Sequence, residues 1–423
     1  MTRKVLPKRP AGPNKEQKES KRLKPPEARA RQIPIPPTTA LPPKKPAPYL
    51  QNLTPTPSHL RPHCLAKDRL RLWTPASALM LNPGHTSPNH HECQRIKDTM
   101  IHAWEEDTRE AYGSGLLMWH CFCDDRAVPE AERAPADQTL LSAFVAHMAA
   151  AYAGRTIANY LHGVRAWHIL HSIPWQLEKR EMDAMLRAAD KLTPASSKRK
   201  KRQPYTPNFI AAVKRQLNLN DPTDAAVFAC LTTCFYASAR LGEFTVRTLE
   251  SFNPSAHVTT RNLSYEQDRN GIKVTVLHLP RTKMASTEGE DVYWASQYGD
   301  TDPAAALLNH LRVNQPSETS HLFAYRVKQA RRPLTKTKFL ERVGKAARAA
   351  GLEPLQGHGI RIGSTLEYLL RGVPFDVMKA KGRWAGDSFL QYLQKHAVII
   401  APYIQAAPPI HENFIRYTMP PAR

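Results

Sequence analysis

Residues 358–396, HGIRIGSTLEYLLRGVPFDVMKAKGRWAGDSFLQYLQKH, decide how this chain is interpreted. The stretch is half apolar and predicted to be helical, yet four of its side chains are not required by a helical core. His358 and Arg361 are three residues apart, a spacing that puts both on one helix face. Trp384 and Tyr392 follow, eight residues apart. These four residues are either scaffold or parts of one active site.

The whole chain is strongly basic. Its 423 residues are enough for two or three domains, and 41% of them are hydrophobic. Lysine and arginine number 60 against 37 aspartates and glutamates, which gives a formal net charge of +23. Such a surface attracts polyanions, most often a nucleic-acid backbone, with a membrane surface as the competing partner. The chain has no run of about 18 apolar residues and no apolar signal segment at its start, so we expect no membrane partner.

The cysteines and histidines do not form a metal-binding pattern. The six cysteines show no spacing typical of a disulfide framework, which suits a reducing compartment. His85, His90, His91 and Cys93 lie close together, but paired C-x2-C and H-x3-H spacings are missing. No carboxylate cluster indicates Mg²⁺, and no GxxxxGK[ST] loop indicates ATP. We therefore expect neither a metal nor a cofactor.

Composition divides the chain into an arm, two domains, a linker and a tail. The first 50 residues hold 13 Lys and Arg, 3 Asp and Glu and 12 of the 37 prolines, which is typical of a disordered arm. A basic cluster within it, KESKRLK at residues 18–24, is either a nuclear import signal or a solvated tail. The predicted segments are a disordered basic Pro-rich arm (1–90), a helical first domain (91–192), a basic linker (193–207), a second domain (208–405) and a C-terminal tail (406–423).

The first domain shows helical periodicity. Residues 139–152 place Leu141, Phe144 and neighbouring apolar residues on one face. Residues 155–171 do the same, and Thr156 is the predicted N-cap. The opposite face of this helix carries Arg155 and Arg165. It either turns to phosphates or is a solvated face.

The second domain is predicted to combine helices with a small sheet. Residues 224–244 form a long helical run, and DRNGIKVTVLHLP at residues 268–280 contains an Asn-Gly turn followed by a strand. EDVYWA at residues 290–295 is expected to pair nearby, and helices resume after about Pro303. The predicted fold class is mainly α with a small β-sheet.

Four separate pieces of this domain carry unusual polar residues. ARLGEF holds Arg240 and Glu243, and LPRTKMAS holds Lys283 in a turn directly after a strand. With the residues of the opening stretch, they resemble the tyrosine recombinase (phage-integrase-like) family. That family has, in order, an Arg, a β-hairpin Lys, His-x-x-Arg, a His or Trp, and a Tyr nucleophile. The resemblance covers roughly residues 109–405.

Within this family, the ending KGRW…SFLxYL is similar to recombinases of eukaryotic, notably fungal, Crypton and DIRS-type mobile elements. Trp384 replaces the commoner histidine, and the interval from Trp384 to Tyr392 is one residue shorter than in many bacterial members. The resemblance implies a helical core-binding (SAM-like) domain followed by a mixed α+β catalytic domain. It also implies metal-free and ATP-free breakage and rejoining of double-stranded DNA.

The resemblance also implies roles for single residues. Arg240 and Arg361 would bind the non-bridging phosphate oxygens, and His358 would add a donor or shift a proton. Lys283 would protonate the departing 5′ oxygen, and Trp384 would donate its indole N–H or buttress the site. Tyr392 would form the 3′-phosphotyrosine, with Tyr403 as the alternative, while Glu243 would orient Arg240. The basic residues expected to contact DNA are Arg155, Arg165, Lys198, Arg199, Lys200, Lys201, Arg202, Arg281 and Arg383.

Three functions fit these residues. The first is a site-specific recombinase that moves a transposable element in the nucleus. It would act as a tetramer on two duplexes that exchanges its C-terminal segment, residues 399–420, between protomers. The second is a catalytically dead, domesticated DNA-binding protein, and the third is a type IB topoisomerase. The intact set of six residues favours the recombinase, and the separate helical domain and long tail favour it over the topoisomerase.

Overall fold

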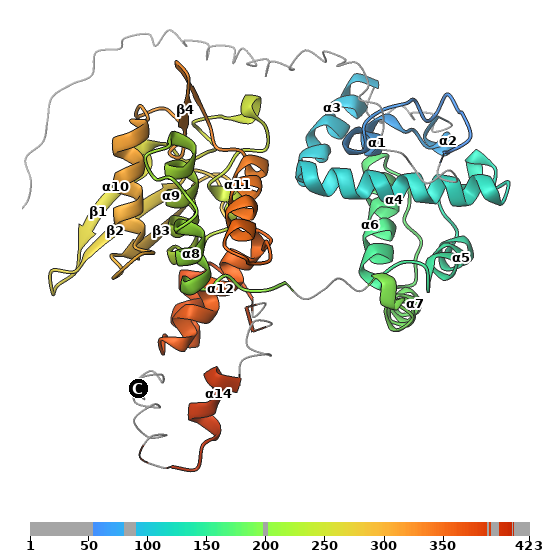
Figure 1. Ribbon diagram of the computed structural model, residues 1–423. Helices are drawn as coiled ribbons and strands as arrows, with labels where there is room; N and C mark the ends of the chain where they lie inside the picture. Colours follow the sequence, from blue (N-terminus) through green and yellow to red (C-terminus); the bar gives the residue numbers. More distant parts are fainter. Residues whose placement is uncertain are drawn as a thin grey trace, which may run out of the picture. The chain divides into compact units, whose positions relative to one another are not determined.

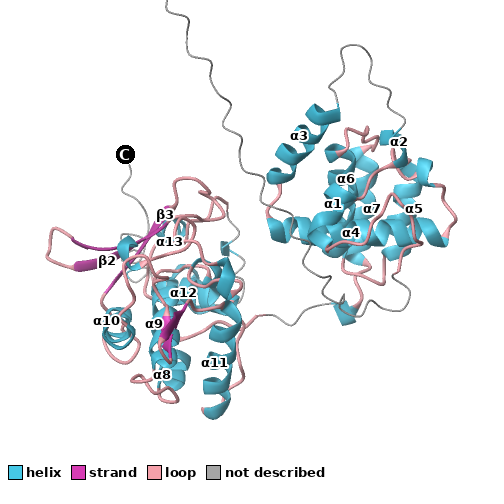
Figure 2. Cartoon of the chain, turned by 90° about the horizontal axis from the view of Figure 1, so that it is seen from above, coloured by secondary structure: helices cyan, strands magenta, loops and turns pink. Residues whose placement is uncertain are grey.

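The computed structural model describes residues 54–79, 90–197, 202–386, 389–390, 397–407 and 409. They form two compact units that divide between residues 199 and 200 (Figures 1 and 2). The described part of the first unit contains helices and no strands, whereas the second combines helices with two small antiparallel sheets. The fold class is thus mainly α with small sheets, as predicted. Within the described ranges, no helix is long and apolar enough to cross a membrane.

The first unit is organised by the crossing of α4 (Glu106–Asp125) and α6 (Gly154–Leu170). A Cβ atom on Gly115 would lie 2.5 Å from Cα of Tyr160, and one on Gly163 would lie 2.4 Å from the carbonyl oxygen of Tyr112. Glycine at both positions therefore allows the two backbones to touch. The remaining helices of this unit are α1 (Arg69–Leu72), α2 (Ala76–Leu79), α3 (His90–Met100), α5 (Gln138–Met148) and α7 (Lys179–Lys191).

Two sequence predictions for this unit are wrong in detail. Thr156 lies within the first turn of α6, because the helix begins two residues earlier and its N-cap residue is Ala153. Part of the predicted arm, residues 54–79, packs onto the helices: Trp73 is 3% exposed, and its carbonyl accepts a hydrogen bond from the Trp167 indole at 2.6 Å. The proline-rich composition of residues 1–90 concealed this anchor. Residues 1–53 and 80–89 lie outside the described part.

The second unit surrounds one buried helix, α9 (Pro222–Tyr236). All residues from Asp224 to Tyr236 are buried, as expected of a helix that is packed on every side. The Asp221 carboxylate caps its first turn, and Pro222 occupies the first helical position. Four helices contact it: α8 (Pro207–Lys214), α10 (Pro303–Asn314), α11 (Lys336–Ala349) and α12 (His358–Leu370).

The chain leaves α9 earlier than the sequence predicts. Ser238 adopts a left-handed conformation, with φ at 52°, and ends the helical run. Arg240 therefore stands at the start of a short 3-10 helix, η5 (Leu241–Glu243), and not on α9. The described part of the unit also contains α13 (Phe375–Lys381) and α14 (Ala397–Ile404).

A three-stranded antiparallel sheet has the order β1 (Leu263–Gln267), β2 (Lys273–Leu279), β3 (Glu290–Ala295). The predicted turn at Gly271, with φ at 83°, and the pairing of β3 with β2 are both confirmed. Strand β1 escaped prediction because it is largely polar and exposed. The second sheet escaped because its strands have three residues each, β4 (Tyr325–Val327) and β5 (Ala330–Arg332).

Candidate active site

Arg240 is held by Glu243, three residues along the chain. One Glu243 oxygen accepts the backbone N–H of Arg240 at 2.8 Å, and the other accepts its Nη1 at 3.0 Å. Burial alone would raise the pKa of Glu243, but Arg383 and Arg240 outweigh it and hold that pKa below its usual value. Glu243 is therefore a carboxylate at neutral pH. It fixes the Arg240 guanidinium, whose side chain stays 32% exposed.

Arg361 ties three segments of the second unit together. It lies in the first turn of α12 and is only 3% exposed. Its Nη1 donates to the Ser238 carbonyl at 3.0 Å, and its Nη2 donates to the Gly382 carbonyl. The Trp384 ring covers the same guanidinium, with 4.3 Å between Cζ and the ring centroid. Arg361 and Trp384 thus form one stacked unit.

His358 stands at the start of α12 and is exposed. Partial desolvation lowers its pKa, and the positive charges of Arg202, Arg361 and Arg240 lower it further. The imidazole is therefore neutral in the free protein at neutral pH. Three guanidinium groups that act on one ring define a strongly cationic centre, which favours an anionic ligand.

Glycines explain how Arg202 reaches this centre. A Cβ atom on Gly363 would lie 1.9 Å from the carbonyl oxygen of Tyr205, and one on Gly359 would lie 2.5 Å from that of Gln203. The Tyr205 N–H also donates to the Gly359 carbonyl at 3.0 Å. The chain that enters the second unit therefore runs directly across α12. The Gly-x-x-x-Gly spacing in GHGIRIG is the sequence signal for this contact.

Lys283 lies in the loop between β2 and β3, where both it and Arg281 are exposed. Between them Thr282 is 4% exposed. Its hydroxyl oxygen accepts the backbone N–H groups of Met284 at 3.2 Å and Ala285 at 3.0 Å, and the hydroxyl donates to Glu290. The loop is thus fixed at Thr282, and its basic side chains flank that anchor.

Arg383 occupies a different place from the predicted one. The sequence predicts a DNA contact, but the side chain is only 8% exposed. Its Nη2 lies 2.6 Å from Glu243, and its Nη1 lies 2.9 Å from Glu290. Both terminal nitrogens are therefore engaged by carboxylates inside the unit. Arg383 and Glu290 are site residues whose positions sequence reasoning missed, because neither stands out in the chain.

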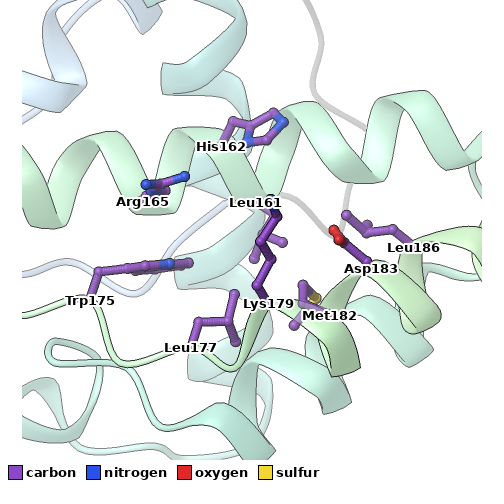
Figure 3. A pocket seen from close by; sticks show the side chains of 9 residues that line it. All are labelled: Leu161, His162, Arg165, Trp175, Leu177, Lys179, Met182, Asp183 and Leu186. Atoms are coloured by element: carbon purple, nitrogen blue, oxygen red, sulfur yellow. The ribbon is translucent and has the colours of Figure 1, made fainter.

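The predicted DNA-contacting residues of the first unit lie on one face of α6. Arg155, Asn159, His162 and Arg165 are all exposed there. Beside them a groove of about 260 Å³ lies between α6 and α7 (Figure 3). Desolvation and the charge of Arg165 lower the pKa of His162. The groove is lined by Leu161, His162, Arg165, Trp175, Leu177, Lys179, Met182, Asp183 and Leu186.

The structure describes five of the six predicted catalytic residues. Contacts and electrostatics bring Arg240, His358, Arg361 and Trp384 together, while Lys283 is next to Thr282 in the anchored loop. Tyr392 lies outside the described residues, as do Lys198, Arg199, Lys200 and Lys201. Within the described ranges, no group of three or more His, Cys, Asp or Glu is placed to hold a metal ion.

No protein-family model and no curated protein matches this chain. Several solved structures do, and they are tyrosine recombinases. A XerH site-specific recombinase bound to a palindromic difH substrate has 13% identity and a TM-score of 0.46, covering 80% of this chain and 94% of that one. A lambda integrase dimer bound to a COC′ core site has 12% identity and a TM-score of 0.37, covering 72% and 94%. The XerA recombinase has 10% identity and a TM-score of 0.30, covering 78% and 98%. At these values the function must rest on the residues of this chain.

Proposed function

We propose that this protein is a tyrosine recombinase that cuts and rejoins DNA strands through a 3′-phosphotyrosine. The observation that carries the proposal is the packing that brings the segments of Arg202, Arg240 and Arg361 together at the start of α12: Arg361 donates to the Ser238 carbonyl at 3.0 Å, and the Tyr205 N–H donates to the Gly359 carbonyl at 3.0 Å. These residues come from separate segments, and a cationic centre of this kind is suited to a phosphodiester. The partly exposed guanidinium of Arg240 can bind the non-bridging oxygens of such an anion through forked hydrogen bonds, while the buried Arg361 adds its positive charge.

In the proposed cleavage step, the phenolic oxygen of Tyr392 attacks phosphorus and the bond from phosphorus to the 5′ oxygen breaks. The phenolic proton passes to the imidazole of His358, which is neutral in the free protein. The departing 5′ oxygen takes a proton from the Lys283 ammonium. Arg240 and Arg361 stabilise the negative charge on the non-bridging oxygens in the transition state, and loss of one such donor typically costs ~10²–10³ in rate. Rejoining is the same sequence in reverse, with a new 5′ hydroxyl as the nucleophile.

The protein is proposed to mobilise a transposable element of the eukaryotic, notably fungal, Crypton or DIRS type, and to act in the nucleus. The support is the sequence ending KGRW…SFLxYL and the basic residues near the start of the chain. Its proposed substrate is double-stranded DNA, bound by the basic face of α6 that includes Arg155 and Arg165. No cofactor enters the mechanism.

The active form is proposed to be a tetramer that exchanges residues 399–420 between protomers. In the described residues, Ile399 of α14 is 5% exposed and packs against Leu366, Leu369 and Met378. Val398 and Ile404 of the same helix are 69% and 74% exposed. A short helix with exposed side chains at 398 and 404 is suited to exchange with a neighbouring copy. A chain truncated after Ala401 should form no tetramers on DNA, and tetramers that persist would contradict the exchange.

A trapping assay tests the proposed chemistry. Nicked suicide duplexes, tiled across the ends of the genomic element, lose a short fragment after cleavage and so retain the covalent protein. The proposal expects an SDS-resistant adduct that is absent in Tyr392→Phe and forms ~10²–10³ times more slowly in Arg240→Ala. Tight binding with no adduct on any duplex would indicate a domesticated DNA-binding protein. Relaxation of supercoiled plasmid by a monomer would indicate a type IB topoisomerase.

A further inference from the structure

We propose that Arg383 is a positioning residue that holds the Lys283 loop in place by linking Glu290 to Glu243. The inference rests on the proposed function, because it assigns Lys283 as the residue that protonates the leaving group. Arg383 itself would touch neither DNA nor the reacting atoms. It would determine whether Lys283 stands where the 5′ oxygen departs.

The link is a continuous series of contacts across the second unit. Glu243, at the end of η5, accepts from Arg240 at 3.0 Å and from Arg383 at 2.6 Å. At its other terminal nitrogen, Arg383 donates to Oε2 of Glu290 at 2.9 Å. The same Glu290 oxygen accepts the hydroxyl of Thr282, the residue next to Lys283. One guanidinium thus connects the residue that orients Arg240 to the loop that carries Lys283.

The backbone at Arg383 indicates that its side chain is needed there. Its φ is 55°, in the left-handed region that disfavours residues with a Cβ atom and favours glycine. Gly382, directly before it, has the Trp384 ring where its own Cβ would stand, at 1.6 Å. An arginine retained in such a conformation, with both terminal nitrogens paired, points to a bridging role.

Charge explains why the bridge matters for an anionic substrate. The side chains of Glu243 and Glu290 are 8% and 22% exposed, so solvent screens them weakly. Of its two partners described above, Arg383 and Thr282, Glu290 would keep only the neutral hydroxyl of Thr282 if Arg383 were removed. A weakly screened carboxylate would then draw the Lys283 ammonium toward itself. This change would move the general acid away from the leaving oxygen.

The matched variants follow from this geometry. Arg383→Gly removes the guanidinium and suits the left-handed backbone, so the turn itself is preserved. Glu290→Ala breaks the same bridge at its other end without changing the backbone at residue 383. Arg342→Met is the control, because it breaks another arginine–carboxylate pair, in which Nη2 lies 2.7 Å from Asp224 on α9.

A substrate with a sulfur leaving group gives the chemical test. When sulfur replaces the bridging 5′ oxygen, a thiolate departs and needs no proton, so general-acid catalysis is bypassed. We expect Arg383→Gly and Lys283→Ala to cleave the ordinary suicide duplex about 10²-fold more slowly than the parent, within the usual range for a lost general acid. Both should cleave the sulfur duplex at close to the parent rate. Equal slowing of Arg383→Gly on both duplexes would overturn the inference.

Hydrogen exchange tests the link without any cleavage. The amides of Thr282, Met284 and Ala285 are hydrogen-bonded within the loop. Peptides that cover residues 280–290 should exchange faster in Arg383→Gly and Glu290→Ala, and at the parent rate in Arg342→Met. Unchanged loop exchange in both bridge variants would refute the coupling. A parent protein that cleaves no duplex would refute the proposed function, and the exchange result would still decide the link.

Discussion

The indole ring of Trp384 covers the guanidinium of Arg361 at 4.3 Å, while the carbonyl of Gly382, two residues before the ring, accepts a hydrogen bond from the same group. One short segment therefore holds Arg361 from two sides. Arg361 is 3% exposed, so its orientation is set by this packing and not by solvent. The role of Trp384 in this arrangement is to position an arginine.

Two replacements of Trp384 should distinguish the effect of its stacking on Arg361 from the effect of its indole N–H. Trp384→Phe keeps an aromatic face over Arg361 but removes the indole N–H, whereas Trp384→Ala removes both. A cation–π contact of this kind contributes about 0.5–2 kcal/mol. We expect Trp384→Ala to slow adduct formation by about tenfold and Trp384→Phe to slow it much less, measured in single-turnover reactions. Equal loss in both variants would show that the indole N–H, and not the stack, is what the reaction needs.

Gly363 should tolerate no side chain. A Cβ atom there would lie 1.9 Å from the Tyr205 carbonyl oxygen, and backbone cannot move aside easily. Gly363→Ala is expected to lower the free energy of unfolding by more than about 1 kcal/mol, although alanine is the better helix former. Urea unfolding measures this change. Gly242→Ala is the control, because nothing lies within 4 Å of its added Cβ. A Gly363→Ala variant as stable as its parent would show that the chain does not cross α12 at this point.

The segment 54–79 should be required for a stable first unit. Arg61 is 8% exposed, and its guanidinium donates to Nδ1 of His120 at 2.8 Å and lies 3.1 Å from Glu130. We expect deletion of residues 1–79 to destabilise this unit by several kcal/mol, since loss of one buried tryptophan side chain, here Trp73, alone costs about 3–5 kcal/mol. Deletion of residues 1–53 should leave the unfolding midpoint unchanged. Thermal unfolding of the two truncated chains distinguishes these outcomes, and equal midpoints would contradict the prediction.

Buried histidines should make stability fall in mild acid. Desolvation lowers the pKa of His168 and His310 to about 4, while unfolded histidine titrates near 6.5. Between these values the unfolded state takes up a proton that the folded state does not. The free energy of unfolding is therefore constant above about pH 6.5 and decreases as the pH falls toward 4. For His310, which is fully buried, the loss reaches about 3 kcal/mol.

Urea unfolding at several pH values checks the predicted decline of the free energy of unfolding between about pH 6.5 and pH 4. Nε2 of His310 donates to the Leu322 carbonyl at 2.8 Å, and its Nδ1 accepts from Asn314 at 3.0 Å, so the neutral ring is fully paired. His310→Gln should be less stable at pH 7.5 and should show a shallower decline in acid. A parent protein whose stability stays constant from pH 7.5 to pH 4.5 would contradict the assignment.

Much of the fold was predictable because its signals are periodic or local. The apolar faces of α5 and α6 follow a repeat that a single sequence reveals, and the turn before β2 is indicated by the dipeptide Asn-Gly. The anchor at Trp73 was not predictable, because one aromatic residue in a proline-rich stretch has no period. Strand β1 was not predicted either, because its polar residues show no alternation of apolar and polar side chains.

The sequence predicts which residues form the candidate site, but it does not show how their side chains are arranged. Arg240, His358 and Arg361 could be singled out by their spacing and order. The prediction that Arg383 contacts DNA did not anticipate its position. A basic residue beside a proposed active site suggests a DNA contact, whereas this side chain pairs with two carboxylates that are distant in the sequence. Such a pairing depends on tertiary contacts, and chain spacing alone does not encode it.

The most direct test of the central claim is to identify the residue that carries the DNA. The adduct trapped on a suicide duplex would be digested with protease and nuclease, and the nucleotide-linked peptide sequenced by mass spectrometry. The account predicts a 3′-phosphate linked to Tyr392. Linkage to Tyr403 would preserve the reaction but overturn the assigned nucleophile. A 5′ linkage, or an adduct that forms in Arg240→Ala at the parent rate, would contradict the mechanism.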